Sequence, residues 1–130
     1  MKTSALKFIP LDSQADFAVG NDLVFIPEFE KSFNSLFQKK VFTDNEIEYC
    51  QQFDYPLLRY ASTWAAKEAV YKSVKQILLS SLPLKRIEII RTNIAGIPKV
   101  VLPESLAHLQ VSLSITHDGD YTWAIAICRK

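Results

Sequence analysis

The sequence has few of the residues and runs that mark several classes of protein. Its only two cysteines, Cys50 and Cys128, stand far apart and show no metal-type spacing. This argues against a disulfide-rich scaffold and favours two free thiols in a reducing cytosol. No apolar run approaches the roughly 20 residues of a membrane span. The apolar stretch near the start is too short for a signal peptide. We therefore expect a soluble, cytoplasmic protein.

Net charge is also nearly absent, at +1 from 15 basic and 14 acidic residues. Such a balance gives no broad attraction to nucleic acid or to a membrane surface, so neither is expected as a partner. Hydrophobic residues make up 48% of the chain, which argues against disorder and allows a real core. The 130 residues fit a single domain spanning residues 1–130.

Glycine is scarce, and each of the three glycines marks a place where the backbone needs freedom or space. Gly20 lies two residues before Asp22, and because it has no side chain it leaves space for another group to approach the chain there. Glycine-rich phosphate loops are missing, as are the HExxH and GxSxG motifs. The chemistry of this protein must therefore rest on a different set of residues.

The hydrophobic pattern predicts one leading strand, then helices, then a run of strands. This order favours an α+β fold in which an antiparallel sheet packs with a long central helix, because the later strands lack helices long enough for parallel crossovers. Pro27 and a capping box at Thr43 and Glu46 open two of the helices. The expected strands are residues 17–26, 84–92, 97–102, 111–116 and 121–128. The expected helices are residues 28–39, a short helix after the capping box at 43–46, residues 56–79 and a turn or two within 103–109.

Asp22 stands inside an apolar strand. With a period of two it shares a face with Ala18, Gly20 and Val24. A carboxylate on such a face is costly unless it meets a cation or hydrogen-bond donors. The residues by themselves leave a second interpretation open, in which Asp22 is a strand-end aspartate turned to water.

Glu68 and Lys72 are four residues apart on the long helix, in the favourable order for a pair on one face. They fit either a functional site or a surface ion pair. His117 closes the apolar face of the strand 111–116, beside a turn, and fits either a structural or an active-site role. Most of the other cations are interpreted as solvated helix and strand ends: Lys39, Lys40, Lys67, Lys72, Lys75, Lys85 and Arg86.

Five segments of the chain resemble the motifs of one family and occur in the same order as in that family. The chain is similar to the holo-acyl-carrier-protein synthases, the short trimeric type of 4′-phosphopantetheinyl transferase. The most specific segment, residues 64–72, resembles the family signature W-A-x-K-E-x-x-x-K. The others are the Gly-x-Asp segment 18–24, the pre-helix segment 41–46, the Gly-x-Pro turn 96–98 and the Ser-x-[Ser/Thr]-His segment 114–118 with Tyr121 and Ala124.

The resemblance implies a magnesium enzyme that moves 4′-phosphopantetheine from coenzyme A to a serine of an apo acyl carrier protein. It places Asp22 and Glu68 as metal ligands and Lys72 as a phosphate contact. It gives His117 a role near the nucleotide. Mg2+ prefers hard oxygen ligands, often one or two carboxylates with phosphates and water. The serine proton is left with two candidate acceptors, Glu68 or a water held by Asp22.

The chain departs from the family at two places. Thr63 stands where the family has an arginine for coenzyme A phosphate. Residues 73–79 contain no glycine where the family has a glycine-rich loop. If the helix continues there, its N–H groups are used up, and Lys75 is expected to replace the lost donors because it shares a face with Glu68 and Lys72.

The partners expected from the resemblance are coenzyme A, an acidic carrier protein and two further copies of the chain. The family receives its carrier on a basic first helix. The corresponding segment here mixes lysines with Glu28 and Glu30, so it is less basic. Two rival functions remain at this point: a trimeric relative that binds without transfer, and an enzyme that uses acyl-coenzyme A in another reaction.

Overall fold

The computed structural model describes residues 16–78, 81–91 and 96–130. Within these ranges strand β1 (Phe17–Phe25) leads into four helices, and strands follow. This order confirms the predicted α+β class. The helices are α2 (Ile26–Ser32), α3 (Ser35–Val41), α4 (Asp44–Gln51) and α5 (Pro56–Val74); the later elements are η1 (Leu84–Arg86), β2 (Glu88–Arg91), β3 (Pro98–Val101), η2 (Glu104–Leu106), β4 (Gln110–Asp118) and β5 (Tyr121–Arg129).

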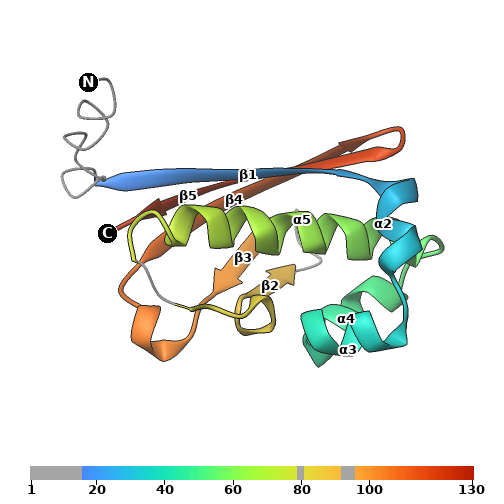
Figure 1. The fold of residues 1–130 in the computed structure, drawn as a ribbon, viewed down its shortest axis with the longest axis horizontal. Coiled ribbons are helices and arrows are strands. Elements are labelled where there is room, and N and C mark those ends of the chain that lie inside the picture. Colours follow the sequence, from blue (N-terminus) through green and yellow to red (C-terminus); the bar gives the residue numbers. More distant parts are fainter. Residues whose placement is uncertain (1–15, 79–80, 92–95) are drawn as a thin grey trace, which may run out of the picture.

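The long helix α5 lies between two antiparallel sheets. One sheet has the strand order β1-β5-β4, and the other is the pair β2-β3. Figure 1 shows α5 running along β1, with α3 and α4 at one end and β2 and β3 on its other side. Opposite residues of neighbouring strands share a face, and Asp22 is opposite Ala124, which is opposite Ile115. Asp22 therefore lies on the face toward α5, as its spacing predicts.

Small side chains let α5 lie close against the sheet. Ala65, Ala66 and Ala69 are completely buried. Gly20 faces the same helix, and a Cβ added there would overlap the carbonyl oxygen of Ala69 and lie 2.6 Å from the backbone nitrogen of Ser73. The close approach predicted at Gly20 is thus made by the backbone of α5.

Replacing Gly20 by alanine is expected to destabilise the fold by about 3 kcal/mol, since overpacking against backbone atoms forces α5 away from β1. Urea denaturation followed by tryptophan fluorescence measures the change. Serine at this position adds one more atom and should cost at least as much. A midpoint for Gly20→Ala equal to that of the parent would show that α5 moves aside at little cost.

The predicted helix at residues 28–39 is wrong in one respect, because two helices replace it. The chain leaves the helix after Ser32, and the side chain of Asn34 accepts a hydrogen bond from the N–H of Phe37 over 2.8 Å, which caps α3. The rings of Phe29, Phe33 and Phe37 still meet across this break. Their helical spacing is therefore satisfied by contacts between two short helices.

Other element boundaries also differ from the prediction. Helix α5 ends at Val74 rather than at residue 79, and residues 79–80 lie outside the described part. The segment predicted as a strand from residue 84 begins as the 3-10 turn η1, and β2 starts only at Glu88. The predicted end of that strand at Thr92 and most of the turn at 93–96 lie outside the described residues.

Lys67 is not a solvated cation. It is fully buried, and its Nζ donates to the Glu46 carboxylate over 2.6 Å. Glu46 also accepts from the N–H of Thr43 over 2.9 Å, which completes the predicted capping box, and from the N–H of Ile89 over 2.7 Å. One carboxylate thus joins α4, α5 and β2 at the centre of the molecule.

Candidate active site between β1 and α5

Asp22 projects from the middle of β1 toward α5 and meets a lysine there. The Nζ of Lys72 donates to Asp22 Oδ1 over 3.0 Å and to the carbonyl oxygen of Asn21 over 3.1 Å. The Asp22 side chain is only 18% exposed. The cation that a buried aspartate requires is therefore present, and the strand-end interpretation of Asp22 is wrong.

Glu68 lies one turn before Lys72 on α5 and stands near Asp22. Burial, followed by the negative charge of Asp22, raises the pKa of Glu68, while Lys72 and Lys75 act in the opposite direction. The expected surface pair of Glu68 with Lys72 does not form within the described residues, because Lys72 reaches across to β1 instead. The negative charge of Asp22 thus acts on Glu68, and Glu68 is hard to ionise without a cation.

This donor set fits a magnesium ion. Asp22 and Glu68 are hard oxygen ligands from two different elements, and Mg2+ commonly takes one or two carboxylates and fills its other positions with phosphate and water. In the described part of the chain, no group of three His, Cys, Asp or Glu residues gathers that could bind a metal alone. The pair therefore suits a metal that is completed by a phosphorylated substrate.

Lys75 belongs to the same end of α5. Its charge acts on Glu68, and its Nζ lies 5.4 Å from the centre of the Tyr71 ring. The backbone after Val74 forms a turn, in which the N–H of Lys75 bonds to Tyr71, that of Gln76 to Ser73, and those of Ile77 and Leu78 to Val74. The helix stops earlier than predicted, but these N–H groups are still occupied, so a phosphate bound here would have to be held by side chains.

Thr63 is turned into the core. It is 2% exposed, its hydroxyl donates to the carbonyl of Arg59 over 2.8 Å, and its Oγ1 lies 3.9 Å from Cys50 Sγ. A short, buried hydroxyl cannot do the work of an arginine at the surface. Burial raises the pKa of the Cys50 thiol to about 11, so this cysteine is an inert core residue.

His117 is the predicted site residue that the chain does not bring to the others. It is exposed, and it lies opposite Thr122, which is opposite Val24. This row is two residues beyond that of Asp22, and β4 and β1 are the two edges of the sheet. Two strand spacings separate them by about 10 Å. Within one chain, Lys72 contacts Asp22 and lies one turn after Glu68 on α5, and His117 stays apart.

A cavity of 480 Å³ opens beside Asp22, and the sequence motifs did not reveal it. Its walls are largely aromatic and come from the end of β1, from α2, α3 and α5; they include Phe25, Glu28, Phe29, Phe37 and Trp64. Trp64 is the first residue of the most specific sequence motif, and its place there was the signal in the sequence that could have pointed to this cavity. Glu28 at the cavity pairs with Lys31 over 3.3 Å, so this face of α2 is not strongly basic.

The whole arrangement matches a known family. Residues 18–128 fit the model of the ACPS family, described as the 4′-phosphopantetheinyl transferase superfamily. The chain belongs to this superfamily. A relative of the transferase, the holo-acyl-carrier-protein synthase of Chlamydia trachomatis, is 37% identical over 118 residues, which are 85% of this chain and 98% of that protein.

Solved structures agree with this membership. The ACPS–CoA complex of Chronobacterium ammoniagenes superposes with a TM-score of 0.75 at 28% identity, covering 87% of the transferase and 96% of that chain. The acyl carrier protein synthase of Mycobacterium tuberculosis gives a TM-score of 0.68 at 33% identity over 86% and 96%. Among the described residues of the transferase, no helix has the length and hydropathy needed to span a bilayer.

Proposed function

We propose that this transferase moves the 4′-phosphopantetheine arm of coenzyme A to a serine of an apo acyl carrier protein. The serine oxygen forms a bond to the phosphorus that carries the pantetheine, the pyrophosphate P–O bond breaks, and 3′,5′-ADP leaves. The observation that carries the proposal is the contact of Lys72 with Asp22 between α5 and β1, with Glu68 one turn before Lys72 on the same helix. The relatives named above are synthases of this kind.

Asp22 and Glu68 would hold Mg2+, which when bound polarises the attacked phosphoryl group and offsets developing negative charge. Lys72 neutralises Asp22 in this structure and is 43% exposed, so its long side chain can swing from the carboxylate to a substrate phosphate. There it stabilises the leaving group. The serine proton goes to Glu68 or to a water held by Asp22.

Incubation of the full chain with coenzyme A, Mg2+ and an apo acyl carrier protein, followed by intact-mass analysis of the carrier, tests the proposal. We expect the mass of one phosphopantetheine to be added at a single serine. A binding protein without transfer activity would be stabilised against heating by coenzyme A and leave the carrier mass unchanged. That pair of results would replace the proposal with the non-catalytic alternative.

Lys75 is expected to contribute to coenzyme A binding, because the backbone donors after Val74 are occupied and Thr63 is buried. A lysine is a point charge without the fork of an arginine, so binding is weaker than an arginine would give. The apparent Michaelis constant for coenzyme A should rise about tenfold in Lys75→Ala, the cost of roughly one charge-assisted hydrogen bond. An unchanged constant would mean that Lys75 only packs on Tyr71.

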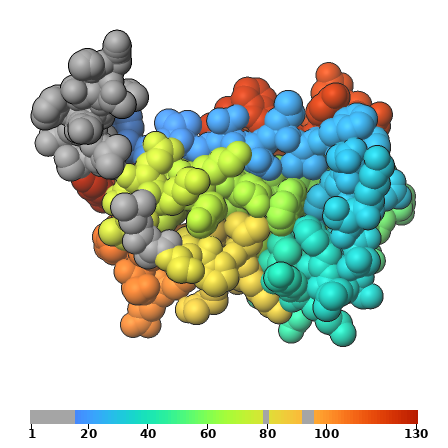
Figure 2. Space-filling model, in the orientation of Figure 1, coloured from blue at the N-terminus to red at the C-terminus, as the bar shows by residue number. Residues whose placement is uncertain are grey.

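The outer face of the three-stranded sheet supports a trimer with active sites between copies of the chain. Figure 2 shows β1 in blue along the rim of the molecule, beside the red strands. Several large apolar side chains of this face are exposed, with Leu23 at 61%; the set is Phe17, Val19, Leu23, Phe25, Tyr121, Trp123 and Ile127. Monomeric proteins rarely expose such a patch. A second copy of the chain is its proposed occupant, because every copy carries the same apolar patch and an assembly would cover it.

We expect the transferase to be a homotrimer in light scattering and to lose that state when the outer face is made polar. Leu23→Glu should yield monomers and reduce transfer, since each site loses its neighbour. Leu36→Glu is the matched control, because Leu36 is exposed on α3, away from this sheet. An active monomer of the parent chain would contradict both the assembly and the shared site.

A further inference from the structure

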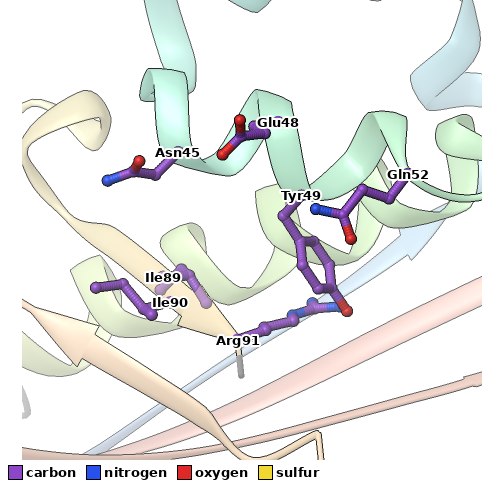
Figure 3. Close-up of a pocket in the computed structure, with 7 residues that line it drawn as sticks. All are labelled: Asn45, Glu48, Tyr49, Gln52, Ile89, Ile90 and Arg91. Atoms are coloured by element: carbon purple, nitrogen blue, oxygen red, sulfur yellow. The ribbon is translucent and has the colours of Figure 1, made fainter. Parts of the chain in front are cut away.

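A cavity of 310 Å³ lies between α4 and β2 and contains none of the transferase residues. Its α4 wall is polar, and β2 supplies an arginine opposite. Figure 3 shows these side chains around the space: Asn45, Glu48, Tyr49 and Gln52 from α4, and Arg91 from the end of β2. The cavity is therefore separate from the cleft at Asp22 and Glu68.

The two walls are held at a fixed distance by buried polar contacts. Glu46 of α4 accepts from the N–H of Ile89 over 2.7 Å, and the hydroxyl of Thr43 donates to Glu88 over 2.6 Å. Both Ile89 and Glu88 belong to β2. Since these bonds are made within the protein itself, the walls need no ligand to hold them in place, and little ordering cost would be added on binding.

Arg91 carries an unsatisfied charge at this cavity. Its Nε and Nη2 atoms are closed to water and have no hydrogen-bond partner in the described part of the chain. Its Nη1 donates to the Tyr49 hydroxyl over 3.5 Å, which is the outer limit of a hydrogen bond. The guanidinium carbon lies 5.2 Å from the centre of the Tyr49 ring. Two guanidinium nitrogens that are closed to water and have no partner are costly, so a ligand that pairs with them gains that energy back.

A second arginine adds positive charge to the same side of α4. The guanidinium of Arg59 lies 4.1 Å from the centre of the Phe53 ring, and this ring lies 5.0 Å from that of Tyr49. Neither arginine forms an ion pair with a carboxylate among the described residues. Both positive charges also act on Cys50, between the two arginines and the core.

We propose that this cavity binds a small molecule through a phosphate or carboxylate group that pairs with Arg91. Nε and Nη2 form the side edge of a guanidinium, and this fork matches two oxygens of either group. The side chain would turn from beneath Tyr49 to present this edge to the cavity. The volume suits a compact ligand. This site goes beyond the proposed transfer and uses none of its residues.

The remaining polar walls restrict the ligand further. The amide of Gln52, just after α4, offers a neutral donor, and the Asn45 amide, which donates to Glu88 over 3.2 Å, retains one further N–H. Glu48 also lines the cavity, and Figure 3 shows its carboxylate on the α4 side, away from the Arg91 guanidinium. A carboxylate at that place accepts from a hydroxyl or ammonium group. The site is thus suited to an oxyanion that also carries such a donor.

Thermal unfolding with inorganic phosphate and, separately, sodium acetate tests the site at constant ionic strength. The full chain is used with Lys72→Ala as the parent, so that anions at the transferase site contribute little. We expect at least one anion to raise the melting temperature of this parent by about 2 °C or more. A response to phosphate alone assigns a phosphate ligand, and a response to acetate assigns a carboxylate ligand.

Arg91→Met and Arg86→Met, each added to that parent, supply the comparison. Arg91→Met should melt higher than the parent without anion, since it removes a buried unpaired charge, and should not respond to anions. Arg86 is exposed on η1, and its variant should behave as the parent does. Arg91→Lys keeps the charge without the fork and should respond weakly. Absence of any anion response in the parent, or an equal response in Arg91→Met, would overturn the proposal.

Discussion

Replacing Glu68 by glutamine is expected to reduce phosphopantetheine transfer more than ~100-fold and at the same time to stabilise the ligand-free protein. The activity falls because a ligand that holds charge in the transition state is lost. The stability rises because ionised Glu68 is half-buried and is repelled by the charge of Asp22, and glutamine carries no charge. Transfer rates at saturating coenzyme A and a melting curve measure the two effects on one sample. The melting temperature should increase by about 1–3 °C.

The stability of the protein should fall with rising pH because of Glu68. The pKa of Glu68 is raised above the ordinary value of 4.5 by burial and by Asp22. Between pH 4.5 and the raised value, the folded chain therefore keeps a proton on Glu68 that the unfolded chain has released. Its stability contribution is complete below pH 4.5 and is lost as the pH rises through the raised value. Glu68→Gln should lack this loss, whereas Glu104→Gln, on exposed η2, should keep it. Near-normal transfer by Glu68→Gln would remove Glu68 from the site.

Replacing Lys67 by methionine is expected to lower the free energy of unfolding by about 3–5 kcal/mol, because the buried carboxylate of Glu46 loses its counter-ion. Burial lowers the pKa of Lys67, and Glu46 acts against that shift, so the pair depends on both partners. Urea denaturation of the full chain measures the loss. The exposed pair of Lys31 with Glu28 is the control, and Lys31→Met should cost under about 0.5 kcal/mol.

A double replacement separates the ion pair from simple packing. Lys67→Met combined with Glu46→Gln leaves no buried charge, so it should lose less than the sum of the two single changes. Glutamine has one carbonyl oxygen, so it can accept from the N–H of Thr43 or from that of Ile89 but not from both, since these groups donate to different oxygens of Glu46. Strictly additive losses would show that Lys67 and Glu46 do not stabilise each other, and would contradict the structural role given to Lys67.

Local sequence patterns predicted the helices, the strands and the orientation of Asp22. They did not predict which residues far apart in the sequence contact each other. The capping box of Thr43 with Glu46 is a contact within four residues, and it formed as predicted. The contact of Glu46 with Lys67 joins residues 21 apart, and no periodicity encodes it. Lys67 stands next to Glu68 on α5, about 100° around the helix, so one enters the core while the other faces the cleft.

The candidate site shows the same division. Family motifs identified Asp22, Glu68 and Lys72, and the structure brings them together. The partner of Lys72 could not be predicted from helix spacing, because it comes from β1 rather than from the preceding turn of α5. His117 stays apart from these residues within one chain, since the sheet separates its row from that of Asp22.

The most direct test of the account is single-turnover transfer from coenzyme A to an apo carrier, followed by intact mass, with Mg2+ present or removed by a chelator. The account predicts one phosphopantetheine per carrier with Mg2+, no product after chelation, and recovery when Mg2+ is restored. Asp22→Asn should lose more than ~100-fold in rate under the same conditions. Full transfer in the presence of the chelator, or an Asp22→Asn rate close to that of the parent, would contradict the central role of the two carboxylates.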